Sequence, residues 1–202
     1  MLKPPAKFIF ESTQYSQSKE FCSSQMIIRP ASLTDLPALT EIYNYYVQNS
    51  EATFDVQPFI PEQRHGWFRD HSDSPGHRIL GAEQNGGEIL GYAASGPFRS
   101  KEGYRTTVEV TVYCSPGATG KGIGAALYRE LFQLLAGEDV HRAVAGIAQP
   151  NAASNTLHER LGFTRVGTFT QVGRKFGKYI DVLWMEKVMP KNQPVEIDPG
   201  AS

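Results

Sequence analysis

The stretch GATGKGIGAALYRE, residues 117–130, constrains the fold of this chain more than any other segment. Gly120, Gly122 and Gly124 stand at alternate positions directly before a run with helical periodicity. Glycine at this density weakens a helix start through its backbone entropy, so the pattern indicates that something approaches the bare backbone there. The run TTVEVTVYC just upstream alternates as a β-strand does. The strand, loop and helix together predict an α/β fold.

The glycine loop is expected to bind an anion, because consecutive N–H groups and the positive end of a helix dipole meet there. A phosphate or pyrophosphate fits this arrangement. A nucleotide P-loop is excluded, since Lys121 is followed by Gly122 and not by Ser or Thr. A dinucleotide fingerprint is also excluded, since the glycines alternate and the region about 20 positions later reads RAVAGIA. A tight turn without a ligand remains the alternative.

Hydrophobic periodicity alternates between strand and helix along the rest of the chain. Ser32 with Asp35 resembles a capping box, Pro61 takes a first-turn position, and QNGG between two apolar runs is typical of a hairpin. Helices are expected at 31–50, 61–71, 125–137 and 152–162. Strands are expected from residue 26, in the hairpin 77–98, and at 106–114, 141–148, 163–173 and 178–188.

Composition limits the classes of partner. Lys and Arg total 20 against 21 Asp and Glu, so no basic field recruits nucleic acid or anionic lipid, and a small partner is expected. No apolar run approaches the roughly 18 residues that span a bilayer, which favours a cytoplasmic protein without a membrane partner. Cys22 and Cys114 have no neighbouring Cys or His pattern, so neither a disulfide framework nor a metal site is expected.

The chain is expected to form one domain with loose ends. Its 202 residues are 40% hydrophobic, which suffices for a single substantial core. Residues 1–25 are rich in Ser, Gln, Lys and Pro and are interpreted as a flexible extension. Residues 190–202 contain prolines and little to bury, and are interpreted as a tail. The predicted domain therefore occupies residues 26–189.

Two linked motifs resemble those of the GNAT acetyltransferase superfamily. The acyl-CoA loop of that superfamily reads [QR]-x-x-G-x-[GA], which Gly122 and Gly124 match, whereas Thr119 replaces Gln or Arg. The stretch NAASNTLHERLGF resembles the second motif, N-x-x-[AS]-x-x-[LF]-Y-x-x-x-G-F, with His158 at the Tyr position. The resemblance implies a twisted, mostly antiparallel sheet, split between its fourth and fifth strands and flanked by helices. It also implies acetyl-CoA as co-substrate.

Three further stretches, GPFRSKEGYRTTVEVTVY, LHERLGF and VGRKFGKYIDVLWME, resemble the phosphinothricin and methionine sulfoximine N-acetyltransferases. Those enzymes acetylate the α-amino group of glutamate-analogue amino acids. General CoA-binding positions would not explain the joint occurrence of Phe98, Arg99, Gly103, Tyr104 and Thr107–Glu109. The resemblance implies an amino-acid N-acetyltransferase whose substrate is phosphinothricin, methionine sulfoximine or methionine sulfone.

The reaction requires a base, because an ammonium group must lose a proton before it attacks the thioester. Glu109 lies mid-strand among valines, which fits a wetted sheet face or a site, and the resemblance implies that it is the base. The backbone of Val112–Cys114 is a candidate to stabilise the thioester oxygen and to pair with pantetheine. His158 is a candidate proton donor to the thiolate, with a structural hydrogen bond as its alternative.

Recognition of an amino acid needs a cation for its carboxylate, and a guanidinium binds carboxylates through two parallel hydrogen bonds. Arg99 stands in the loop where the resembling enzymes hold substrate; Arg105 is a second candidate, and a solvated loop is the alternative. The expected substrate-binding residues are Arg99, Ser100, Lys101, Glu109, Val110 and Thr111. The expected acetyl-CoA-binding residues are Val112, Tyr113, Cys114, Gly120, Lys121, Gly122, Ile123, Gly124, Ala125 and Asn151, the last also a plausible N-cap.

Other functions stay open at this point. Acetylation of a protein N-terminus or a polyamine is one, although a polyamine would want an acidic pocket and the segment 99–105 is basic. A non-catalytic acyl-CoA-binding module is another, against which the presence of Glu109 counts. The resembling enzymes are commonly dimers, so a homodimer is expected.

Overall fold

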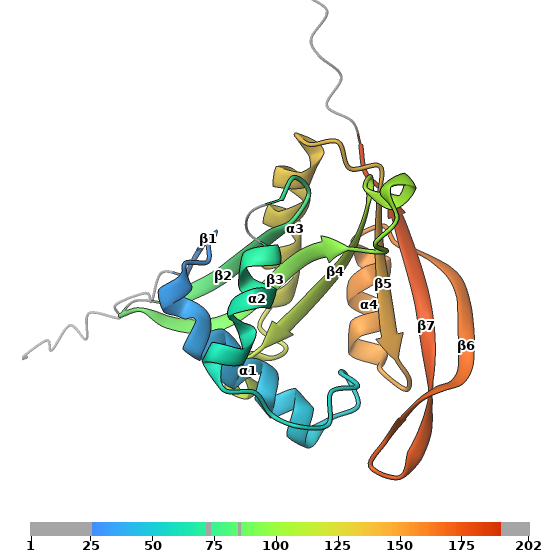
Figure 1. Ribbon diagram of the computed structural model, residues 1–202, viewed down its shortest axis with the longest axis horizontal. Coiled ribbons are helices and arrows are strands. Elements are labelled where there is room, and N and C mark those ends of the chain that lie inside the picture. The colour runs from blue at the N-terminus through green and yellow to red at the C-terminus, as the bar shows by residue number, and fades with distance from the viewer. Residues whose placement is uncertain (1–25, 72–73, 85, 191–202) are drawn as a thin grey trace, which may run out of the picture.

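The computed structural model describes residues 26–71, 74–84 and 86–190 (Figure 1). The extension predicted at 1–25, with Cys22, and the tail from 191 onward lie outside these residues. The strands are β1 (Ile27–Pro30), β2 (Arg78–Gln84), β3 (Glu88–Pro97), β4 (Thr107–Cys114), β5 (Arg142–Ala148), β6 (Thr164–Lys175) and β7 (Lys178–Val188). The α-helices are α1 (Leu36–Asn49), α2 (His65–Asp70), α3 (Ile123–Ala136) and α4 (Ala152–Arg160). Short 3₁₀ turns occupy η1 (Leu33–Asp35), η2 (Pro61–Arg64), η3 (Glu102–Tyr104) and η4 (Pro116–Ala118).

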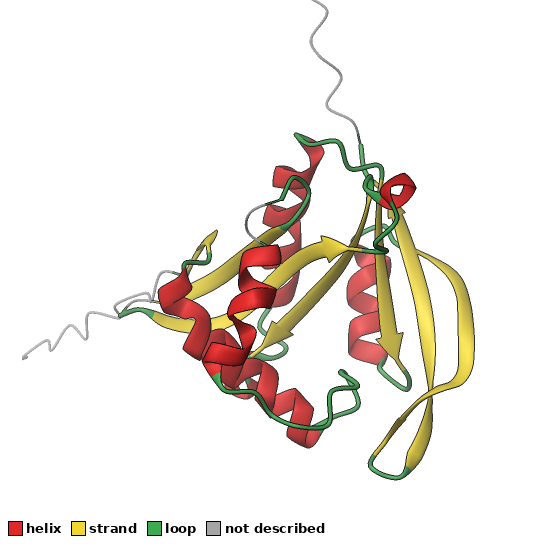
Figure 2. Ribbon diagram, viewed as in Figure 1, coloured by secondary structure: helices red, strands yellow, loops and turns green. Residues whose placement is uncertain are grey.

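Within the described residues, seven strands form one mixed sheet in the order β1-β2-β3-β4-β5-β7-β6. Every neighbouring pair is antiparallel except β4 and β5, which are parallel. Helices α1 and α2 cover one face, and α3 and α4 cover the other (Figure 2). The predicted α/β class, the order of strands and helices, and the mostly antiparallel sheet are confirmed.

The sheet opens between its two parallel strands. The register joins β4 to β5 only from Thr107 to Glu109, opposite Arg142 to Val144. Beyond Glu109, β4 continues to pair with β3, while β5 continues to pair with β7. The facing edges of the two strands are therefore left without a ladder partner among the described residues. This is the split predicted between the fourth and fifth strands.

The alternation of β4 divides the core into two layers. Val108 and Val110 are buried beneath α3, where they join Leu127 and Leu131. The other layer packs α1 and α2 on the opposite sheet face, and its members include Leu36, Leu39, Phe68, Ile79 and Tyr92. Burying each such side chain contributes about 1.5–3 kcal/mol. Because successive residues alternate between faces, Glu109 lies on the α1 and α2 side.

The capping box predicted at Ser32 is present. The backbone N–H of Ser32 donates to the Asp35 carboxylate at 2.7 Å, and Arg29 pairs with the same carboxylate at 2.7 Å. These donors lower the pKa of Asp35 to about 2, with Arg29 the largest cause. The carboxylate thus fixes the start of α1 against β1.

The β6–β7 hairpin is joined to the far end of α1 by one buried lysine. Lys175 is 2% exposed, and its ammonium donates to the carbonyls of Ser50 and Thr53 at 2.7 Å and of Tyr46 at 3.2 Å. Three donors meet three acceptors, so the cation is satisfied without a carboxylate. The loop after α1 and the hairpin therefore form one wall beside the split.

Candidate active site

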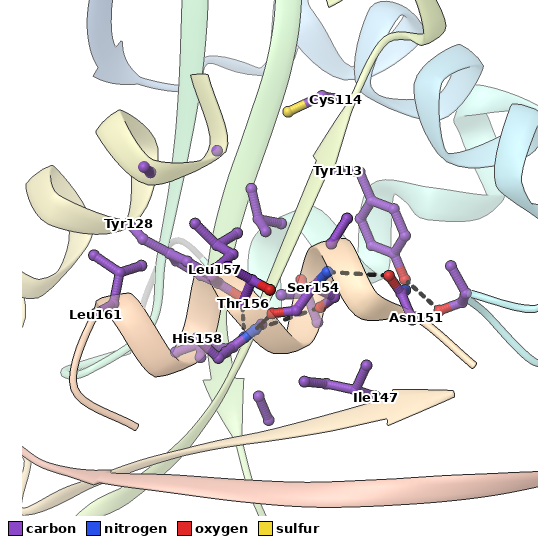
Figure 3. Close-up of a pocket in the computed structure, with 18 of the residues that line it drawn as sticks. Tyr113, Cys114, Tyr128, Ile147, Asn151, Ser154, Thr156, Leu157, His158 and Leu161 are labelled. Atoms are coloured by element: carbon purple, nitrogen blue, oxygen red, sulfur yellow. Dashed lines mark hydrogen bonds between the residues drawn. The ribbon is translucent and has the colours of Figure 1, made fainter. Parts of the chain in front are cut away.

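A cavity of about 970 Å³ occupies the split and lies between β4, β5 and the starts of α3 and α4 (Figure 3). Most of the residues predicted to bind acetyl-CoA line it: Val112, Tyr113, Cys114, Gly120, Gly122, Gly124, Ala125 and Asn151. Val110, Thr111 and His158 line it as well. The side chains of Lys121 and Ile123 do not: Lys121 is exposed, and Ile123 is buried in the core.

The glycine loop owes its composition to backbone conformation. Gly120 has φ +74° and Gly122 has φ +81°, and Gly122 is the N-cap residue of α3. A Cβ at either position would have no described atom within 4 Å. Protein packing therefore does not require these glycines, whereas the left-handed backbone does. Gly120, Gly122 and Gly124 all line the cavity.

Glu109 lies beside the cavity and does not line it. It is the last β4 residue paired with β5, so its half-buried carboxyl stands where the split begins. Burial raises the pKa of Glu109, and the charge of Arg99 offsets part of that increase. A carboxyl with a raised pKa next to an opening cleft is suited to accept a proton near neutral pH.

Aromatic rings surround the loop that carries Arg99. The Arg99 guanidinium lies 4.8 Å from the Phe98 ring centroid, and Phe98 packs edge-on against Tyr104 and Trp184, both at 5.8 Å. Trp184 is the ladder partner of Gly146 on β5, and a Cβ on Gly146 would lie 3.3 Å from the Trp184 ring. Arg99 is exposed and its charge reaches Glu109, so the structure brings these two predicted residues into one region.

The other residues predicted to bind substrate in this loop are Ser100, Lys101 and, as a second candidate for the carboxylate, Arg105. Ser100 and Lys101 are exposed next to Arg99. Arg105, the second candidate for the carboxylate, instead forms ion pairs with Asp139 at 2.9 Å and Glu102 at 3.6 Å. That pairing directs Arg105 to the end of α3, so Arg99 is the better placed cation.

His158 is buried on α4 with both ring nitrogens engaged (Figure 3). Nδ1 lies 2.8 Å from the Ser154 carbonyl, which can only accept, so Nδ1 carries the hydrogen. Nε2 then accepts from the Tyr128 hydroxyl at 3.3 Å. Burial lowers the pKa of His158, which favours the neutral ring. The structural hydrogen bond considered for this residue is therefore present, and it occurs at the cavity wall.

The sequence reading missed several residues that line the cavity. Tyr128 packs against His158 with ring centroids 5.3 Å apart, and burial raises its pKa above the usual range. Arg129 and Arg160 are exposed cations on α3 and α4. The available signal was their position, since Arg129 follows the glycine loop and Arg160 lies within the second motif. Asn151 was identified, and its side chain does accept the Ser154 N–H at 3.0 Å as an N-cap.

Two absences concern the described residues alone. Within them, no helix is both long and apolar enough to cross a membrane. The same ranges hold no cluster of three or more His, Cys, Asp or Glu side chains placed to bind a metal ion. The expectation that the chemistry proceeds without a metal stays a prediction.

A mixed sheet that opens between two parallel strands, beside a glycine-rich helix start, is the arrangement of an acyltransferase domain. The chain belongs to the GNAT acetyltransferase family, because the model of the acetyltransferase (GNAT) domain matches residues 28–184. This match confirms the family resemblance drawn from the glycine loop and the second motif.

Curated relatives and a solved structure agree with this assignment. The chain is 51% identical over 166 residues to phosphinothricin N-acetyltransferase of Streptomyces coelicolor, covering 82% of this chain and 97% of that protein. It is 42% identical over 159 residues to the L-methionine sulfoximine/L-methionine sulfone acetyltransferase of Pseudomonas paraeruginosa, covering 79% and 92%. A putative acetyltransferase from Salmonella typhimurium, solved with its cofactor acetyl-CoA, superposes with a TM-score of 0.79 at 37% identity, covering 86% and 99%.

Proposed function

We propose that this enzyme transfers the acetyl group of acetyl-CoA to the α-amino group of a small amino acid analogue: phosphinothricin, methionine sulfoximine or methionine sulfone. The observation that carries the proposal is the position of Glu109. Its partly buried carboxyl marks the point where the sheet opens, with Arg99 on the same side. The names of the relatives supply the class of acceptor.

Acetyl-CoA fits the cavity as an added strand followed by an anion site. Pantetheine amides pair with the free edge of β4 at Val112–Cys114, by the β-augmentation that exposed edges support. The pyrophosphate lies on the N–H groups of residues 120–125 at the start of α3. Lys121 and Ile123 contribute only their backbone N–H groups to this pyrophosphate site. Arg129 and Arg160 add positive charge at the cavity wall.

The acceptor enters from the α1 and α2 side of the sheet. Arg99 binds its carboxylate, and Glu109 takes a proton from its ammonium group, which leaves a lone pair to attack the thioester carbon. A backbone N–H of Val112–Cys114 stabilises the charge that develops on the thioester oxygen. The C–S bond then breaks, and the thiolate leaves beside the Tyr128–His158 pair and takes up the second proton that the acylated nitrogen loses. His158 gives up a proton there only in its charged form, which burial disfavours.

The test is acetyl transfer by the purified protein. The protein is incubated with acetyl-CoA and each of the three analogues, and free thiol release is followed. Thiol release with at least one analogue is expected, and Arg99→Met should raise the KM for the amino acid while the KM for acetyl-CoA stays unchanged. Release with none of the analogues, but with an N-terminal peptide or a polyamine, would reject the substrate class. Acetyl-CoA binding without transfer to any amine would indicate a binding module.

A homodimer in the cytoplasm is part of the same proposal. Edge strand β6 supports the dimer, because among the described strands it pairs only with β7, and it exposes Val166, Phe169 and Val172 by 62%, 57% and 59%. A long apolar edge strand is a template for another chain unless it is covered. A second copy of this chain is the proposed cover, and cytoplasmic acetyl-CoA is the proposed supply.

A further inference from the structure

His71 packs against β3 at Gly96, the ladder partner of Glu109. It directly follows α2, which packs over β3 (Figure 1). A Cβ built on Gly96 of β3 would overlap the His71 imidazole, with Nε2 its nearest atom. The absence of a side chain at Gly96 therefore gives the ring its place on the sheet.

The partner of Gly96 in the β3–β4 ladder is Glu109. Directly opposed residues of antiparallel strands point to the same face, with Cβ atoms about 4.5–5.5 Å apart. His71 Nε2 lies close enough to overlap the position that a Cβ of Gly96 would take, which places it near the cross-strand site next to Glu109. No direct hydrogen bond or ion pair joins these two described side chains, so the Glu109 carboxyl is placed to reach Nε2 through one water.

The hydrogen bond made by Nδ1 of His71 determines the tautomer of the ring, and therefore whether Nε2 can accept a proton. His71 Nδ1 lies 2.8 Å from the Trp67 carbonyl, so Nδ1 carries the hydrogen and Nε2 presents a lone pair. Burial lowers the pKa of His71, and His77 and Arg64 lower it further, whereas the hydrogen bond with the Trp67 carbonyl and the charge of Asp70 raise it. At neutral pH the ring is therefore neutral and able to accept a proton.

We infer that His71 is a positioning residue for the reaction, which accepts at Nε2 the proton that Glu109 takes from the substrate. This inference rests on the proposed function. An N–H bond of the ammonium breaks as an O–H bond forms on Glu109. That O–H bond then breaks as an N–H bond forms on Nε2, and the imidazolium releases the proton to water. Glu109 returns to its ionised form, and the acceptor keeps its lone pair.

The kinetic test compares His71→Gln with His65→Gln, a matched change of an exposed histidine at the start of α2. His71→Gln should lower kcat/KM about tenfold or more at neutral pH and shift the acidic limb of its pH profile. His65→Gln should change neither. Added imidazole should restore activity to His71→Ala, because the vacated half-buried site beside Gly96 admits it. An unchanged pH profile together with no rescue would overturn the inference.

A second measurement needs no turnover. The ring pKa of His71 is read by NMR of histidine-labelled protein, in the wild type, in Glu109→Gln and in the exposed control Glu102→Gln. Loss of the neighbouring negative charge should lower the pKa of His71 in Glu109→Gln alone. Equal values in all three would refute the pairing. If the pKa of His71 falls in Glu109→Gln alone but the wild type releases no thiol with any analogue, the His71–Glu109 pairing stands and the proposed function is rejected.

Discussion

At the scale of single residues, Glu109 combines a proposed catalytic role with a cost to folding. Burial raises the pKa of its carboxyl above the usual value. A carboxyl whose folded-state pKa exceeds its unfolded value stabilises the fold at low pH, and this contribution is lost as the pH rises through the folded pKa. At neutral pH the ionised group therefore lowers the free energy of unfolding, while it supplies the base that the reaction needs.

Replacement of Glu109 by Gln should separate these two effects. We expect kcat/KM to fall about 10²- to 10⁴-fold at neutral pH, since the proton acceptor is lost. The free energy of unfolding at pH 7 should rise, since no charge remains to be desolvated. Thiol release and urea denaturation measure the two quantities, with exposed Glu88→Gln as the control. Full turnover in Glu109→Gln would remove its role as the base.

At the scale of secondary-structure elements, a substitution in the glycine loop can test the proposed pyrophosphate contact, because there is room for an added methyl group. Gly120→Ala meets no described atom within 4 Å, so its folding cost is only the strained φ, about 1–2 kcal/mol. A new methyl group would nevertheless stand where the pyrophosphate approaches the backbone. We expect acetyl-CoA affinity, measured by calorimetry, to fall at least tenfold. Gly117→Ala, in equally open space without a positive φ, should bind normally, and equal affinities would contradict the proposed contact.

Lys175, which joins the β6–β7 hairpin to the end of α1, allows a separate prediction about stability. Lys175→Met removes the ammonium that three carbonyls share. The Tyr46 carbonyl keeps the Ser50 N–H at 3.1 Å, whereas the carbonyls of Ser50 and Thr53 lose the ammonium donor, and a buried acceptor left unpaired costs about 1–3 kcal/mol. Because the loop can partly relax toward water, we expect the free energy of unfolding to fall by about 2–4 kcal/mol. Urea denaturation measures this change, and exposed Lys178→Met on the same hairpin is the control. A change no larger than in the control would show that the hairpin holds without the lysine.

Across the whole molecule, the sequence predicts what is periodic or local and misses what arises from packing. The order of strands and helices, the hairpin at Gly86 and Gly87, and the N-cap at Asn151 follow from short-range patterns. The Tyr128–His158 bond and the overlap of His71 with the Gly96 position join residues 30 and 25 positions apart through the packed sheet. No periodicity records such contacts, so they became visible only with the fold.

The assembly is the largest scale at which a prediction can be made. A sheet edge that exposes Val166, Phe169 and Val172 should bury them against a second copy, because apolar burial contributes about 25 cal/mol per Å². The mass in solution should therefore be twice the 22.4 kDa of one chain. Phe169→Lys with Val172→Lys should give the monomer, since two unpaired charges cannot be desolvated there. Val56→Lys, at another exposed apolar position in the loop after α1, should leave the mass unchanged. Light scattering after size-exclusion chromatography measures all three, and a wild-type monomer at every concentration would reject the dimer.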